Sequence, residues 1–153
     1  MSERKLRTVA EIIAFAIERE KEAAESYGRM AELAEAPGLR ELLTFLRGEE
    51  EGHRRLLEGL TAGQIRRFAP ARVPDLVITD YLVPETLGLD MSLQDLLVFA
   101  AQKEKRAADL YDGLARLASG SETARLFEFL AGQERAHKLK LEAEYEKHVL
   151  TEN

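Results

Sequence analysis

The fold is decided by the stretch LTFLRGEEEGHRRLL, residues 43–57. Its apolar residues recur at alternating spacings of three and four, which is the pattern of a helix that buries one face. On that face leucines flank Glu50 and His53, which occupy positions where further leucines are expected. A carboxylate and an imidazole in a buried row need partners inside the protein. The stretch therefore predicts a helix that carries a polar site into the core.

The same pattern returns 84 residues later, which is the separation between His53 and His137. Residues 126–141, LFEFLAGQERAHKLKL, place Glu134 and His137 on the buried face as another Glu-x-x-His motif. Two of the three histidines of the chain lie in these motifs. Residues at i and i+3 share one face of a helix, so each pair can approach the same ion. A repeat of this length indicates two similar helical hairpins.

The remaining two predicted helices repeat each other at the same offset. Glu20 lies midway along the buried face of the first helix, and Glu104 occupies the matching position in the third. Tyr27 and Tyr111 follow seven residues after these glutamates. The pattern is equally compatible with tyrosines that pack in the core and with tyrosines that act at the site. Each of the four helices therefore directs one glutamate inward.

The predicted fold class is all-α, a four-helix bundle in a single domain over residues 1–153. The helices are expected at residues 9–35, 39–60, 93–118 and 122–149. They form hairpins over residues 8–62 and 92–150, and the first and third helices start after a hydroxyl residue with an acid three positions later.

A long connection, residues 63–91, separates the two hairpins. It holds three of the four prolines of the chain. A turn between neighbouring helices needs only a few residues, so this segment is expected to cross the length of the bundle, as in ferritin-like bundles. Its apolar run, residues 76–78, is expected to be an extended segment packed on the bundle rather than a strand.

Four carboxylates in one core need compensation for their charge. They could take up protons, pair with Lys or Arg, or bind cations, but the four buried faces offer no Lys or Arg nearby. Two divalent metal ions would balance four carboxylates, with two neutral imidazoles as further ligands. Oxygen ligands with one nitrogen per ion favour iron or manganese, and zinc remains an alternative.

Gly48 and Gly132 are expected either to make room beside the metals or to allow close helix approach.

Composition excludes several other functions. The net charge of −6 gives no electrostatic support for nucleic-acid binding. The chain has no cysteine, which excludes disulfides and thiolate metal sites. No apolar run is long enough to span a membrane, and no signal segment precedes the first helix, so a cytoplasmic location is expected.

Taken together, these motifs resemble the ligand set of rubrerythrins and the wider ferritin-like di-iron family. The resemblance covers nearly the whole chain and rests on Glu20-x6-Tyr27, Glu50-x-x-His53, Glu104-x6-Tyr111 and Glu134-x-x-His137. It implies that Glu50 and Glu134 bridge two iron ions. It also implies terminal ligands from Glu20, Glu104, His53 and His137, with both tyrosines close to the site.

Two departures from rubrerythrins shape the functional hypothesis. This chain lacks the cysteine-ligated rubredoxin-type domain, so electrons would come from a separate donor such as a rubredoxin-like protein. Rubrerythrins also have an extra glutamate where this chain has Ala107. The resemblance implies a di-iron oxidoreductase that reduces hydrogen peroxide or dioxygen. The alternative is a non-catalytic metal-binding or iron-handling protein. A homodimer is among the expected assemblies, and neither a nucleic acid nor a membrane is an expected partner.

Overall fold

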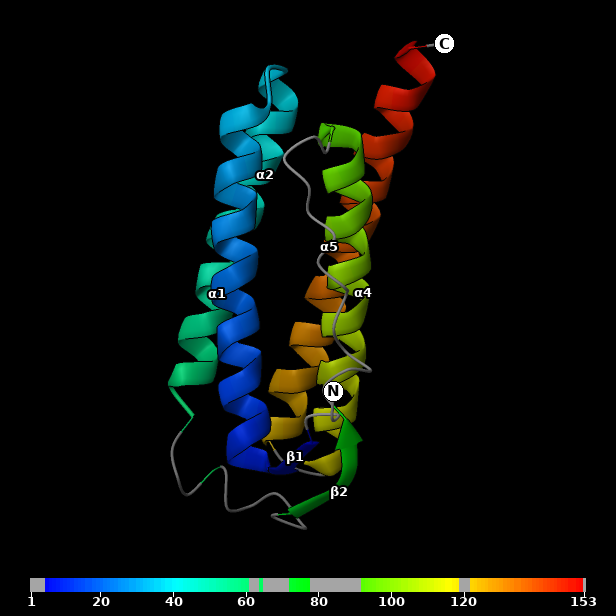
Figure 1. Cartoon of the computed structure of the whole chain (residues 1–153). Helices are drawn as coiled ribbons and strands as arrows, with labels where there is room; N and C mark the ends of the chain where they lie inside the picture. The colour runs from blue at the N-terminus through cyan, green and yellow to red at the C-terminus, as the bar shows by residue number, and fades with distance from the viewer. Residues whose placement is uncertain (1–4, 61–63, 65–71, 78–91, 119–121, 153) are drawn as a thin grey trace.

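Four long helices form the body of the molecule, which is described here by a computed structural model. The structure describes residues 5–60, 64, 72–77, 92–118 and 122–152. The helices are α1 (Val9–Leu33), α2 (Pro37–Glu58), α4 (Leu93–Leu117) and α5 (Glu122–Glu152). Figure 1 shows α1 packed along α2 and α4 packed along α5. The predicted four-helix bundle of two hairpins is confirmed.

The course of the chain agrees with a crossover between the hairpins. In Figure 1, α2 ends at the end of the bundle where α1 begins, whereas α4 begins at the opposite end. Glu58 and Leu93 therefore lie at opposite ends of the bundle, as the predicted crossover requires. Most of the predicted crossover, residues 63–91, lies outside the described residues.

Side-chain caps begin two of the helices where the sequence predicts them. The Glu11 N–H donates to the Thr8 hydroxyl at 3.1 Å at the start of α1. Ser92 and Asp95 form a reciprocal capping box at the start of α4, with bonds of 3.1 and 3.3 Å. Each cap satisfies N–H groups that have no partner within the helix. Helix α2 begins at Pro37, two residues before the predicted start, because proline is well tolerated in the first helical turn.

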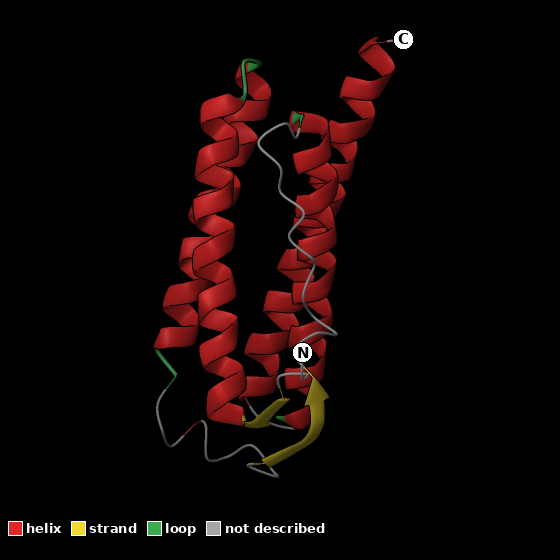
Figure 2. Ribbon diagram, in the orientation of Figure 1, coloured by secondary structure: helices red, strands yellow, loops and turns green. Residues whose placement is uncertain are grey.

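A short antiparallel sheet lies at one end of the bundle (Figure 2). Strand β1 (Lys5–Thr8) pairs with β2 (Arg72–Val77), with Leu6 opposite Leu76 and Lys5 opposite Val77. The expectation that residues 76–78 form an extended segment packed on the bundle rather than a strand is therefore wrong for Leu76 and Val77, while residue 78 lies outside the described residues. Apolar and β-branched residues suit a strand, but the partner that completes it is far away in the sequence.

Two apolar cores fill the bundle, one on each side of its middle. One lies towards the sheet and includes Ile12, Leu57, Leu114 and Phe127, all of which are fully buried. The other core lies towards the opposite end of the bundle. It is built from Tyr27, Met30, Ala34, Leu39, Leu43, Leu46, Leu97, Ala100, Ala101 and Leu141. Burying one such leucine stabilises the fold by about 1.5–3 kcal/mol. The six predicted site residues lie between these cores.

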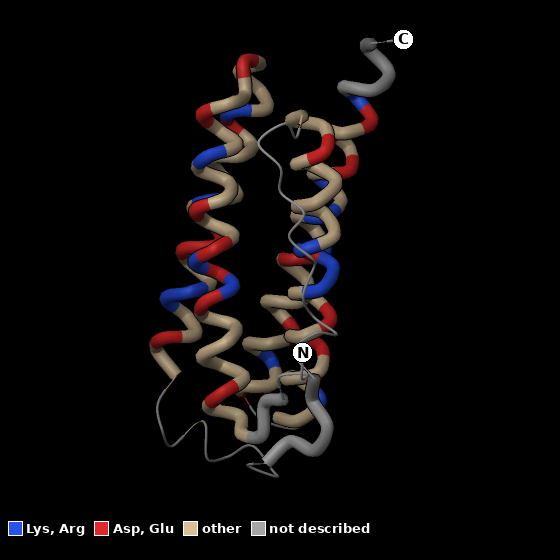
Figure 3. Tube along the Cα trace, viewed as in Figure 1, with Lys and Arg blue, Asp and Glu red and all other residues tan. Residues whose placement is uncertain are grey.

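Charged residues of both signs are distributed along the outside of all four helices (Figure 3). No helix in the described part of the chain is both long enough and apolar enough to cross a membrane.

Gly48 and Gly132 lie on the outer faces of α2 and α5, and both are exposed. Each precedes a site glutamate by two residues, which turns it about 200° away around the helix. A Cβ added at either glycine would meet no atom of the described residues within 4 Å. Both expectations for these glycines, space beside the metals and close helix approach, are therefore wrong for the described residues.

Candidate metal centre

Six polar side chains from four helices meet in the middle of the bundle. All are buried, with 1–3% of their surface exposed: Glu20, Glu50, His53, Glu104, Glu134 and His137. Glutamate is rarely buried to this extent unless it is paired. Every predicted ligand is therefore where the helical pattern placed it, and the repeat has produced one convergent cluster.

The Nδ1 atom of His53 marks the first half of the cluster. It lies 2.8 Å from Glu134 Oε1, 3.7 Å from Glu20 Oε2 and 3.9 Å from Glu50 Oε1. Three helices, α1, α2 and α5, supply these residues.

The Nδ1 atom of His137 marks the second half with nearly the same distances. It lies 2.8 Å from Glu50 Oε1, 3.7 Å from Glu104 Oε2 and 4.0 Å from Glu134 Oε2. The two imidazole rings stack with their centroids 5.7 Å apart. The sequence repeat is thus reproduced as an approximate two-fold symmetry of the site.

These contacts define two groups that could each hold a metal ion, and the groups share Glu50 and Glu134. Within each group the ligand atoms lie within 4.8 Å of one another. Metal–ligand bonds of about 2.1 Å place neighbouring ligands about 3.0 Å apart at right angles and opposite ligands about 4.2 Å apart. The measured separations, 2.8–4.0 Å, fall close to that range. The donor atoms present therefore fit a bound cation in each half.

Unpaired buried atoms also favour cations at this site. In the described part of the chain, five buried atoms of this cluster have no hydrogen-bond partner: Glu20 Oε2, Glu50 Oε1, Glu104 Oε2 and both ring nitrogens of His137. The 2.8 Å approach of His137 to Glu50 therefore lacks hydrogen-bond geometry, whereas the equal approach of His53 to Glu134 has it. An unpaired buried polar group costs about 1–3 kcal/mol. Donor atoms that converge without bonding to one another are suited to a shared positive ion.

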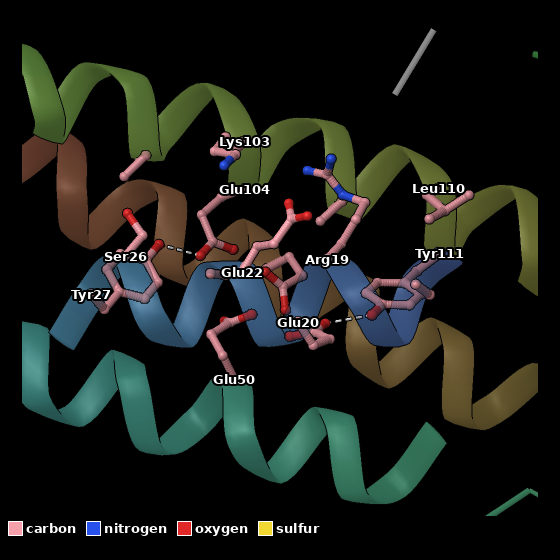
Figure 4. Close-up of a pocket in the computed structure, with 15 residues that line it drawn as sticks. Arg19, Glu20, Glu22, Ser26, Tyr27, Glu50, Lys103, Glu104, Leu110 and Tyr111 are labelled. Atoms are coloured by element: carbon pink, nitrogen blue, oxygen red, sulfur yellow. Dashed lines mark hydrogen bonds between the residues drawn. The ribbon is translucent and has the colours of Figure 1, made fainter. Parts of the chain in front are cut away.

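The tyrosines link the two hairpins through the candidate ligands. The Tyr27 hydroxyl of α1 donates to Glu104 of α4, and the Tyr111 hydroxyl of α4 donates to Glu20 of α1. Figure 4 shows both hydrogen bonds. Burial, followed by the charges of nearby glutamates, raises the pKa of both tyrosines well above the ordinary value of 10.0. Their phenols therefore remain protonated and act as fixed donors to the carboxylates.

The metal-free centre does not readily hold four negative charges. Burial raises the pKa of Glu50 and of Glu134 well above 4.5, and the neighbouring carboxylates, Glu104 first, raise both further. For Glu20, burial acts upwards, but contacts with Glu50, His53 and Tyr111 outweigh it and lower the pKa. Glu50 and Glu134 therefore keep their protons above the pH at which an ordinary glutamate loses them, unless a bound cation takes the place of these protons.

A small cavity opens between α1 and α4 beside the cluster (Figure 4). Its volume is about 30 Å³, and about 10–15 Å³ is enough for one water molecule. Glu20, Glu50 and Glu104 point into it, and Ala23 and Ala107 are among the small residues that line it. Helical periodicity did not reveal this cavity. The available signal was the repeated pair of alanines on the helices that carry Glu20 and Glu104.

Comparisons with known proteins support the fold but supply no function. Neither a protein-family model nor a curated protein matches the chain. A solved structure described as a hypothetical protein from Pyrococcus furiosus is similar to it, with 27% sequence identity and a TM-score of 0.69. The similarity covers 91% of this chain and 89% of that protein.

Proposed function

We propose that this chain is a di-iron carboxylate oxidoreductase that reduces hydrogen peroxide or dioxygen with electrons from a separate donor protein. Glu50 and Glu134 would bridge the two ions. Glu20 and His53 would complete one position, and Glu104 and His137 would complete the other. Oxygen-rich ligands with one imidazole per ion suit iron, and they also suit manganese or zinc.

The observation that carries the proposal is the sharing of Glu50 and Glu134 by two ligand groups beside a cavity. Shared carboxylates would keep two ions close together, so that both can act on one small molecule. The cavity has room for about two water molecules, which matches the two oxygen atoms of peroxide or dioxygen. A bulky substrate would require the lining residues to move.

Reduction of hydrogen peroxide to two water molecules consumes two electrons and two protons. Two bound ferrous ions would supply the two electrons, and an external donor would restore them. The protein residues hold the geometry: Tyr27 and Tyr111 fix the carboxylates of Glu104 and Glu20 by donating hydrogen bonds. Because each hydroxyl already donates to a carboxylate of the centre, we assign both tyrosines positioning roles.

The rubrerythrin-like motifs support the same reaction class, and Ala107 distinguishes this chain within it. Ala107 lines the cavity at the position where rubrerythrins carry an extra glutamate. We expect slower turnover than with that glutamate, and Ala107→Glu should increase it. The alanine also favours the alternative function, a non-catalytic metal-binding or iron-handling protein.

Anaerobic loading with ferrous ion followed by rapid mixing with hydrogen peroxide tests the proposal. We expect about two ions per chain, rapid oxidation of both, and continued consumption of peroxide when a reductant is present. The double variant Glu50→Gln with Glu134→Gln should lose metal binding. The matched control, Glu41→Gln with Glu128→Gln, changes exposed glutamates of the same two helices and should behave as the wild type. Wild type that binds two ions but leaves them ferrous in excess peroxide would support the non-catalytic alternative.

A further inference from the structure

The outer nitrogen of His137 has a hydrogen-bond requirement that its own cluster does not meet. Nδ1 of this ring faces the carboxylates, so the neutral imidazole carries its proton on Nε2. Nε2 is buried and has no hydrogen-bond partner among the described residues. A carboxylate oxygen of Glu49 lies 3.9 Å away, which is too long for a hydrogen bond but leaves no space for another residue between them.

Glu49 is able to close this distance. Its side chain is 36% exposed, whereas the ring of His137 is 2% exposed and held by packing. A half-exposed glutamate has several rotatable bonds, and a shift of about 1 Å would produce a charge-assisted hydrogen bond of about 2.8 Å. The hydrogen bond would satisfy the buried N–H without disturbing any ligand of the centre.

We propose that Glu49 is a positioning residue for His137. Its carboxylate accepts a hydrogen bond from Nε2–H, holds Nδ1 towards the ion, and makes the imidazole a stronger ligand. Hydrogen bonds from a carboxylate to the outer nitrogen of a ligand histidine act in this way in metal sites. The inference rests on the proposed metal centre, but it concerns a residue that is not itself a ligand.

The proposal also makes the two ion positions unequal. In the second repeat, the position of Glu49 is taken by Gln133, and the histidine that corresponds to His137 is His53. A glutamine amide carries no full charge, so it would strengthen a ligand imidazole less than a carboxylate does. The six ligands alone are nearly symmetric, whereas this pair of residues is not. The ion beside His137 should therefore be bound more tightly than the ion beside His53.

Anaerobic titration of metal-free protein with Co²⁺, followed by visible absorption and calorimetry, tests this asymmetry. Wild type should bind two ions in two separate steps. Glu49→Gln should weaken the tighter step by about 10–100-fold and leave the other unchanged. Gln133→Glu should instead tighten the weaker step. Glu51→Gln is the matched control, because this neighbouring carboxylate lies beside Arg47 at 3.3 Å and should leave both steps unchanged.

Nuclear magnetic resonance of the Co²⁺-loaded protein separates positioning from a general structural effect. The ring N–H protons of ligand histidines give strongly shifted, exchangeable signals. Replacing Glu49 by Gln should speed solvent exchange of one such signal, and Glu49→Ala should speed it further. Alanine is a better helix former than glutamine. If the substitutions acted only by damaging helix α2, Glu49→Ala would therefore have a smaller effect than Glu49→Gln.

The outcomes distinguish this inference from the metal centre itself. If wild type takes up no Co²⁺, the metal centre is wrong and the role of Glu49 falls with it. If wild type binds two ions and Glu49→Gln alters neither step, or alters both to the same extent, the metal centre stands and the positioning role is wrong.

Discussion

Metal-free protein should lose stability as the pH rises above the ordinary glutamate pKa of 4.5. Burial, followed by the charges of neighbouring carboxylates, raises the pKa of Glu50 and Glu134 in the folded state above the ordinary value of 4.5. The unfolded chain releases these protons near 4.5, while the folded chain retains them to higher pH. Their contribution is therefore fully present below 4.5 and is lost as pH rises through the folded-state pKa values. The pKa of Glu20 is lowered, so this carboxylate acts in the opposite direction. It stabilises the fold above pH 4.5, and its contribution is lost only as the pH falls below that value.

The magnitude follows from proton linkage. Where the folded state holds one more proton than the unfolded state, the free energy of unfolding falls by about 1.4 kcal/mol per pH unit. In a chain of 153 residues, 1 kcal/mol corresponds to about 2–4 °C in Tm. Each carboxyl group should therefore lower Tm by about 3–6 °C per pH unit within its window. Saturating Mn²⁺ should oppose this trend, because the ion binds the deprotonated carboxylates.

Thermal unfolding followed by circular dichroism, with and without Mn²⁺, measures both trends. The metal-free double variant Glu50→Gln with Glu134→Gln should keep its helices, show a flatter pH profile and gain no stability from the ion. The exposed control pair, Glu41→Gln with Glu128→Gln, should reproduce the wild-type slope. A metal-free wild type whose Tm is constant or rises over this pH range, with a double variant that behaves identically, would refute the reasoning.

Other substitutions test separate parts of the structure. Tyr27→Phe removes the hydrogen bond to Glu104 and should lower the free energy of unfolding of the metal-loaded protein by about 1.5–3 kcal/mol in urea titrations; no change would mean that the bond does not form. Gly48→Ala and Gly132→Ala should each raise stability by about 0.5–1 kcal/mol, because the added methyl group meets no atom of the described residues; a loss of stability would reveal a contact with something other than the described residues. His137→Ala should abolish oxidation by peroxide in stopped-flow assays, and an unchanged rate would exclude this residue as a ligand.

The ligand positions were predictable because they depend on local geometry. The period of an α-helix determines which side chains share a face, and Glu50 and His53 interrupt an otherwise apolar face. The repeat then supplied an independent second observation at Glu134 and His137. A polar residue on a buried face must be compensated, so the pattern predicts chemistry as well as structure.

Relations between helices were not predictable in the same way. A helical period does not say which neighbour lies opposite a given face. The sequence therefore left open whether Tyr27 packs in the core or acts at the site, and the structure shows that its hydroxyl crosses to Glu104 of the other hairpin. The pairing of Leu6 with Leu76 likewise depends on two segments that meet only in the folded chain.

The arrangement of ligands makes metal binding part of the association between the hairpins. Each candidate group takes three residues from one hairpin and one from the other, with Glu50 and Glu134 as the residues that cross over. Packing is extensive within each hairpin and much sparser between them. Cations at the centre would relieve the repulsion between carboxylates of the two hairpins and join them by direct ligand bonds. Binding free energy would then act as folding free energy for the association of the hairpins, in addition to the two apolar cores, which both contain residues of the two hairpins.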